Sequence, residues 1–179
     1  MAYSIHEEAA LRERGIEVLK TGMAEQDTAK AHIQRFLLYP PMWEQIPLLH
    51  DLQWHSVKFL QENKSAVESK RGVYTFSVQM EGHMVPPSGY VMYVGKASNL
   101  RRRYNEYFRE KEYKYDSHRY HIACLLSRWV NYIYFNFSYI KDETSEADIE
   151  KVLINGMQPP FNRSSFEGIL GISRREAFQ

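Results

Sequence analysis

The sequence has one cysteine, almost no net charge and no long apolar run. Cys124 cannot form a disulfide within the chain, which fits a reducing compartment. The first twenty residues have no continuous apolar stretch and include four acidic residues, Glu7, Glu8, Glu13 and Glu17. This pattern argues against a signal peptide or a membrane span. We therefore expect a cytoplasmic protein with no membrane partner.

The formal net charge of +1 gives no overall attraction to a polyanion. Any contact with nucleic acid would need local clustering of basic residues. One such cluster is present, made of Lys96, Arg101, Arg102, Arg103 and Arg109. A glycine-rich loop of the ATP-binding type is absent. With 179 residues and 44% apolar content, the chain can bury a core of one domain and carry a sizeable appendage.

The first seventy residues favour helices. A first pattern of helical spacing covers residues 27–37, and a second runs from Trp43 to Leu60 with a break near Pro47. This region contains no catalytic motif. We expect residues 1–70 to form a helical N-terminal region that serves as a scaffold or in dimerisation or DNA recognition.

From Gly72 the pattern changes to extended strands. The first has one face made of Tyr74, Phe76 and Val78, and the second has one made of Tyr90, Met92 and Val94. Turn residues between Gln79 and Gly89 predict a long hairpin loop. An antiparallel pair would bring Tyr74 and Tyr93 near each other.

The rest of the chain alternates helix and strand. Residues 98–109 have helical periodicity behind a cap at Ser98 or Asn99, and a second amphipathic helix covers residues 122–129. Residues 131–140 alternate as a strand, and a helix opened by Ser145 ends near Gly156. We predict an α/β (α+β) core with a small central antiparallel sheet flanked by helices. Its expected bounds are residues 71–165, followed by a tail at residues 166–179.

Five polar residues stand out along this core, namely Tyr74, Tyr93, Arg103, Glu150 and Asn162. Phosphodiester hydrolysis can use these groups, namely a pair of phenols, a guanidinium that binds phosphate and one carboxylate that binds a metal ion. Each residue alone has a simpler interpretation, because strands favour aromatic residues and most helix glutamates lie at the surface. Glu150, however, shares a helix face with Ala147 and Ile154, where burial without a cation would be costly.

The motifs Gly72-Val73-Tyr74 and Tyr93-Val94-Gly95-Lys96-Ala97, with the downstream Arg103, Tyr107, Glu150 and Asn162, resemble the GIY-YIG nuclease family. The resemblance covers residues 72–162. It implies a metal-dependent DNA endonuclease, of a restriction type or from a mobile element. The alternatives are a DNA-repair incision nuclease and a non-catalytic nucleic-acid-binding protein on the same fold.

The resemblance also implies a role for each residue. Tyr74 would be the general base and Tyr93 would orient the water or the phosphate, although these two roles can be exchanged. Lys96 would lower a tyrosine pKa, Arg103 and Tyr107 would hold the phosphate or the leaving group, and Asn162 would fix the loop after the last helix. Glu150 would be the sole protein ligand of Mg²⁺ or Mn²⁺. The basic cluster would bind DNA, with a homodimer cutting both strands.

One competing metal site is weaker. His118, His121 and Cys124 share a helical spacing, but no fourth soft ligand has a matching position, so zinc is disfavoured.

Overall fold

The computed structural model describes residues 28–30, 32–34, 36, 38, 40–44, 52–80, 89–112 and 119–162. The chain divides into two compact units, Met1–Arg35 and Phe36–Gln179. In the first unit, residues 28–30 and 32 are helical. The tip of the expected hairpin loop, residues 81–88, and the expected tail lie outside the described residues. Within the described ranges, no helix has the length and apolar character needed to cross a membrane.

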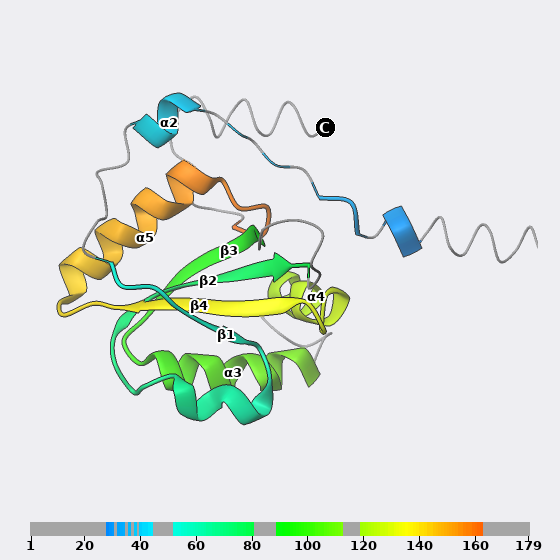
Figure 1. The fold of residues 1–179 in the computed structure, drawn as a ribbon, viewed down its shortest axis with the longest axis horizontal. Helices are drawn as coiled ribbons and strands as arrows, with labels where there is room; N and C mark the ends of the chain where they lie inside the picture. The colour runs from blue at the N-terminus through cyan, green and yellow to red at the C-terminus, as the bar shows by residue number, and fades with distance from the viewer. Residues whose placement is uncertain are drawn as a thin grey trace, which may run out of the picture. The chain divides into compact units, whose positions relative to one another are not determined.

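A four-stranded antiparallel sheet forms the centre of the second unit (Figure 1). Its strands are β1 (His55–Lys58), β2 (Gly72–Gln79), β3 (Gly89–Ala97) and β4 (Ile133–Tyr139). They lie in the order β1-β4-β2-β3, so β3 is an edge strand. The predicted fold, a small antiparallel sheet with flanking helices, is confirmed.

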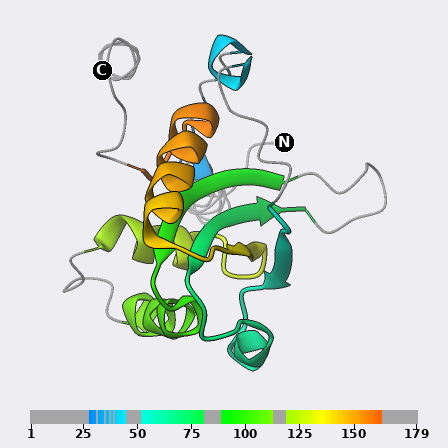
Figure 2. The ribbon, with the colours of Figure 1, turned by 90° about the vertical axis from the view of Figure 1, so that its left-hand side faces the viewer.

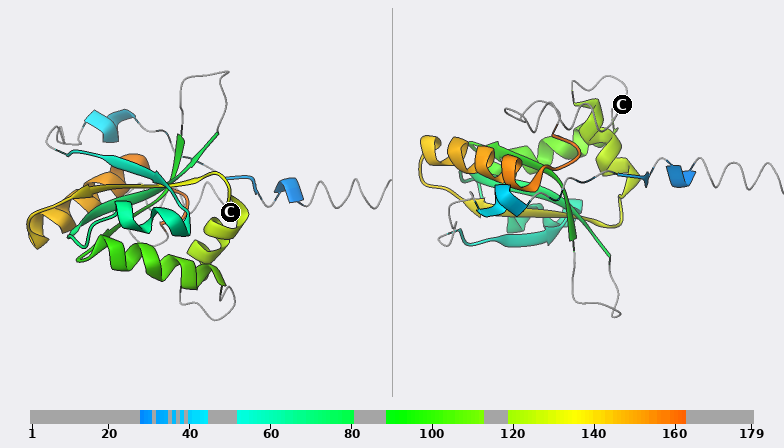
Figure 3. Two further views of the ribbon diagram at one scale, coloured as in Figure 1. Left: turned by 60° about the horizontal axis from the view of Figure 1, so that its bottom comes forward. Right: turned by 90° about the horizontal axis from the view of Figure 1, so that it is seen from above.

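Helices cover both faces of this sheet (Figures 2 and 3). One face carries the 3-10 helix η1 (Gln61–Ala66) with α3 (Leu100–Glu112) and α4 (Tyr120–Arg128), and the other carries α5 (Glu143–Met157). The short helix α2 (Pro40–Glu44) reaches α5, because the Trp43 indole donates a hydrogen bond to the Gly156 carbonyl at 3.0 Å.

Side-chain caps explain where the two long helices begin. The Asn99 carboxamide accepts a hydrogen bond from the Arg102 amide at 2.8 Å, as the sequence predicted for α3. The Asp142 carboxylate does the same for the Ser145 amide, so α5 begins before the residue expected to open it. At its other end, α5 stops at Gln158, whose φ of 48° is left-handed.

The two faces of the sheet bury different cores. The α3 and α4 face is rich in aromatic residues and includes Phe59, Tyr74, Phe76, Tyr104, Tyr107, Phe135 and Phe137. The α5 face has a smaller aliphatic core of Val73, Val94, Leu153 and Ile154. Alternation along β2 produces this division, since Val73 and Tyr74 point to opposite faces.

The helix expected between Trp43 and Leu60 is wrong for its second half. Residues 55–58 form β1, which pairs with β4 from His55 opposite Phe137 to Lys58 opposite Tyr134. Residues 61–66 follow as η1. A four-residue strand gains its stability from the strand beside it, so local apolar spacing did not reveal it. The sheet therefore takes a strand from the region that was expected to be helical.

A bulge in β3 corrects a second expectation. Phe76 pairs with Tyr93 while the next residue of β2, Ser77, pairs with Val91, so Met92 is the extra residue. Met92 lies in the aromatic core, whereas Val94 lies in the aliphatic one. The prediction that Met92 and Val94 share a face is wrong, because the bulge shifts the alternation by one residue.

The segment after α5 covers the free edge of β3. The Phe161 amide donates to the Met92 carbonyl at 3.0 Å. The Asn162 carboxamide then accepts from the Val94 amide at 2.9 Å and donates to the Val94 carbonyl at 2.8 Å. Its side chain thus replaces a neighbouring strand at a position where both backbone groups are buried.

This clamp predicts a measurable loss of stability. Asn162→Ala leaves the two Val94 backbone groups without their partner, and each abandoned buried group costs about 1–3 kcal/mol. We expect the free energy of unfolding to fall by about 2–6 kcal/mol, measured by urea denaturation. The matched control is Asn63→Ala, which removes one side-chain hydrogen bond to the Lys58 carbonyl. Equal losses in the two variants would contradict the clamp.

Candidate active site

Two buried tyrosines form the centre of the site. The hydroxyls of Tyr74 on β2 and Tyr107 on α3 lie 2.6 Å apart. Their side chains are 2% and 0% exposed, and burial raises the pKa of both phenols far above the ordinary value of 10. Neither phenol releases a proton readily in this environment.

Tyr93 occupies a different environment beside them. Its ring centroid lies 6.2 Å from that of Tyr74, and its side chain is only half-buried. Burial raises the Tyr93 pKa, the charge of Arg119 lowers it, and the carboxylate of Glu150 raises it. Hydrogen bonding to Tyr74 and Tyr107 lowers it further. Tyr93 therefore lies within electrostatic reach of the phenol pair, a guanidinium and the candidate metal ligand.

Gly95 makes room for this arrangement. It pairs with Tyr74 across the two strands. A Cβ at this position would lie 2.5 Å from the Tyr74 hydroxyl and 3.0 Å from the Tyr93 ring, far inside van der Waals contact. Only glycine lets the Tyr74 ring lie across the edge strand.

Arg103 presents a donor without a partner. One end of its guanidinium pairs with the Glu106 carboxylate at 3.1 Å, while its Nε is buried and has no hydrogen-bond partner in the described part of the chain. Its charge lowers the pKa of both Tyr74 and Tyr107, so it lies near their hydroxyls. A buried unpaired N–H is costly, and a phosphate oxygen is the kind of acceptor that would satisfy it.

Lys96 and Glu150 lie on the other side of the edge strand. The Lys96 ammonium on β3 and the Glu150 carboxylate on α5 are 3.4 Å apart. Burial raises the Glu150 pKa, Lys96 lowers it, and the neighbouring Glu146 raises it again. The carboxylate is thus desolvated and only partly compensated, which would favour binding of a further cation.

The chain fits one type of metal ion. Among the described residues, no group of three or more His, Cys, Asp or Glu side chains could hold a metal. Glu146 is occupied by Arg71 at 3.1 Å, which leaves Glu150 as the carboxylate at the site. A single carboxylate suits a divalent ion that keeps much of its water shell.

Three of the predicted DNA-contact residues, Arg101, Arg102 and Arg109, lie in different environments. Arg101 donates to the Val67 and Ser65 carbonyls at 2.6 and 3.3 Å and so ties α3 to the segment around η1. Arg102 faces Glu106 at 3.5 Å and is largely exposed. Arg109 is exposed and has no ion pair among the described residues. The geometry supports a structural role for Arg101, and its predicted contact with DNA stays a prediction.

The sequence analysis missed Arg119. It stands immediately before α4, and its charge lowers the pKa of both Tyr93 and Tyr107. No spacing rule connected it to the tyrosines, because it reaches them only through the packing of α4 against α3. By contrast, His121 and Cys124 belong to no metal-binding group among the described residues.

Comparison with known proteins shows the family of this chain. A search of the curated proteins finds UvrABC system protein C of Mycoplasma genitalium, which is 39% identical over 76 residues. The match covers 42% of this chain but only 11% of that protein. No solved structure matches the chain. The model of the UvrC-like GIY-YIG domain matches residues 70–163, just over half of the sequence. This chain therefore belongs to that family and carries a GIY-YIG nuclease domain of the phosphodiester-hydrolysing endonuclease type.

Proposed function

We propose that this protein is a divalent-metal-dependent endonuclease that hydrolyses phosphodiester bonds of DNA. The observation that carries the proposal is that the candidate catalytic groups meet around strand β3. The pKa of the half-buried Tyr93 is affected both by the Tyr74 and Tyr107 phenols and by the Glu150 carboxylate. The nearby Arg103 Nε supplies an unused donor for a phosphate oxygen.

We assign Tyr93, rather than Tyr74, as the general base. Tyr74 is buried and its hydroxyl is occupied by Tyr107, whereas Tyr93 is more accessible. Burial opposes the Tyr93 phenolate, while the charge of Arg119 and a hydrogen bond from the Tyr74 and Tyr107 pair favour it. As the phenolate, Tyr93 would take a proton from the attacking water and become a neutral phenol, while the Tyr74 and Tyr107 pair would stabilise the phenolate before that transfer. The family resemblance left open whether Tyr74 or Tyr93 is the general base, and this assignment exchanges the roles first expected for them.

Phenylalanine substitutions separate the three tyrosine roles. Tyr93→Phe should lower the cleavage rate by about 10²–10⁴-fold, because that is the usual contribution of a general base. Tyr74→Phe should have a weaker effect, with a fold reduction in rate at least about ten times smaller than that of Tyr93→Phe, because it removes only a hydrogen bond to the base. The control is Tyr104→Phe, whose hydroxyl bonds the Leu60 carbonyl at 2.7 Å and which should lose stability but keep its rate. Single-turnover cleavage of a defined DNA gives the rates. A larger effect at Tyr74 than at Tyr93 would reverse the assignment.

The divalent ion would bind at Glu150, with water and substrate oxygens completing its shell. Such an ion supplies Lewis-acid stabilisation of charge on the phosphate. The Lys96 ammonium pairs with the same carboxylate and would hold it in position or contact the phosphate itself. Mg²⁺ and Mn²⁺ both fit a single carboxylate.

Metal binding can be tested without cleavage. Mn²⁺ at ten times its dissociation constant should stabilise the protein by about 1.4 kcal/mol, seen as a rise in melting temperature. Glu150→Gln should abolish this rise and reduce cleavage by at least about 100-fold, because it removes the charge and keeps the shape. The control Asp148→Asn, an exposed carboxylate of α5, should retain both. Retention of the Mn²⁺ effect in Glu150→Gln would place the metal elsewhere.

The biological branch follows from a weaker observation. The similar segment belongs to a component of the UvrABC system, which favours the repair-incision alternative over the restriction-type or mobile-element interpretation. The match spans about a tenth of that protein, so its substrates and partners do not transfer as a whole. The restriction-type interpretation and the homodimer stay predictions.

A further inference from the structure

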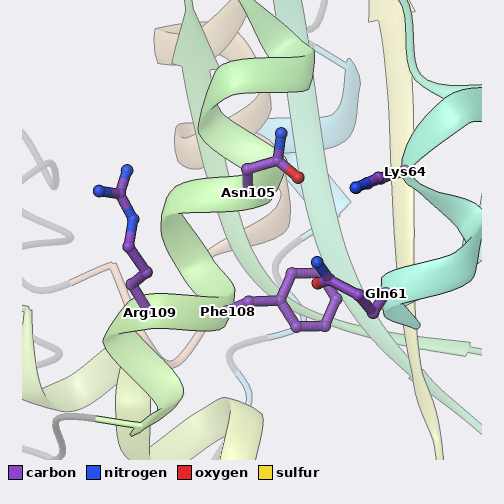
Figure 4. A pocket seen from close by; sticks show the side chains of 5 residues that line it. All are labelled: Gln61, Lys64, Asn105, Phe108 and Arg109. Atoms are coloured by element: carbon purple, nitrogen blue, oxygen red, sulfur yellow. The ribbon is translucent and has the colours of Figure 1, made fainter.

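A cleft of about 500 Å³ lies between η1 and α3, apart from the tyrosine cluster (Figure 4). Gln61 and Lys64 line it from η1, and Asn105, Phe108 and Arg109 line it from α3. The site residues Arg103 and Tyr107 belong to the same helix. Because Arg103 and Asn105 are two residues apart, about 200° of helical rotation separates them and places the cleft on a different side of α3.

The cleft carries two cations and no acid. Lys64 and Arg109 are exposed, and neither forms an ion pair in the described part of the chain. Figure 4 shows Lys64 and Arg109 on opposite sides of α3, with Asn105 and Phe108 between them. Glu106, which follows Asn105 on α3, is already paired with Arg102 and Arg103, and the exposed Glu62 of η1 is not part of the lining. The described lining of the cleft therefore carries positive charge although the chain is almost neutral.

The other lining groups suit a nucleotide chain. Phe108 is held rigidly, because its ring stacks on Phe59 with the centroids 4.3 Å apart. Neither the Gln61 nor the Asn105 side chain has a hydrogen-bond partner in the described ranges, so both amides can donate to phosphate or sugar oxygens. Cations with amide donors between them are groups that contact the phosphates and sugars of a nucleic-acid backbone.

We propose that this cleft is a second DNA-binding subsite, in which Lys64 and Arg109 neutralise phosphates of the substrate backbone outside the cleavage site. The inference rests on the proposed nuclease function and extends it. Arg103 and Arg109 are six residues apart on α3, which is about 9 Å along the helix axis, and they lie on different sides of the helix. At about 3.4 Å per nucleotide along a duplex strand, the axial rise alone spans about three nucleotides, so the cleft would contact phosphates at least that far from the cleaved bond. The subsite would hold DNA beside the scissile phosphate and add affinity that the catalytic residues alone do not provide.

The test measures DNA affinity against salt. The full-length protein, in EDTA to prevent cleavage, binds a fluorescent 20-base-pair duplex, and anisotropy gives the dissociation constant from 50 to 200 mM NaCl. Lys64→Gln and Arg109→Gln should each reduce the slope of log affinity against log salt by about 0.9, and the double variant by about 1.8. The control Lys141→Gln removes an exposed charge away from the cleft and should keep the slope. All three substituted residues are exposed, and unchanged melting temperatures of the four variants will show that the fold is intact.

A cleavage assay with metal separates this inference from the nuclease proposal. The double variant should raise KM and leave the rate at saturating DNA unchanged, because the cleft does not touch the reacting phosphate. An unchanged slope and KM in the double variant overturns the subsite while the nuclease stands. The subsite is also overturned if Lys64→Gln and Arg109→Gln each lose no more affinity than Lys141→Gln, because equal losses show only a general charge effect. If the unmodified protein neither binds nor cleaves DNA, both proposals fall.

Single neutral linkages locate the contact. Methylphosphonates placed one at a time along both strands outside the cleaved bond should include at least one position that weakens binding by the unmodified protein and leaves binding by the double variant unchanged. Equal weakening of both proteins at every position would show that the cleft contacts no phosphate and would overturn the proposal.

Discussion

The side of the sheet on which Tyr93 lies depends on one extra residue in an edge strand. Regular pairing would place Tyr93 with Val91 on the α5 face, because alternate residues point to alternate faces. The bulge at Met92 moves Tyr93 and Gly95 to the face of Tyr74, and it leaves Val94 and Lys96 on the face of α5. From Tyr93 onward the alternation is regular, so the Tyr93 phenol and the Lys96 ammonium, three residues apart, lie on opposite faces of the strand. The active site is built around the edge of the sheet rather than on one of its faces, and bulges are frequent at such edges because they redirect side chains.

An edge strand that carries a site also needs its free hydrogen-bonding groups covered. The segment after α5 does this through the Phe161 amide and the Asn162 carboxamide. The same contacts join the end of α5 to β3, so they hold the helix that carries Glu150 against the strand that carries Lys96. Asn162 has both ends of its amide engaged with Val94, and it is 6% exposed. Its geometry suits a positioning residue, and the expectation that it fixes the loop after the last helix stays a prediction.

Periodicity predicted the elements whose pattern is set locally. Strand β2, strand β4 and the two helices α3 and α4 all have a clear apolar period, and the Asn99 cap was recognisable as well. Strand β1 was missed because its four residues, His55 to Lys58, become a strand only through pairing with β4, almost eighty residues later. The bulge was missed because an extra residue has no local signature when Met92 and Tyr93 are both compatible with a buried face. The motif spacing identified the polar residues of the site, but Arg119 required the packing of α4 against α3.

The electrostatics of the site indicate what the free protein still lacks. Burial opposes the phenolates of Tyr74 and Tyr107 and the carboxylate of Glu150, while the Arg103 Nε lacks an acceptor in the described part of the chain. A phosphate would satisfy the Nε, and a divalent cation would offset the Glu150 charge that now raises the Tyr93 pKa. For Tyr93 only the cation acts toward activation, because it offsets a negative charge that raises the pKa of the phenol, whereas the anionic phosphate is held by Arg103. The metal would thus activate Tyr93, and the enzyme would keep that phenol protonated until the metal is bound.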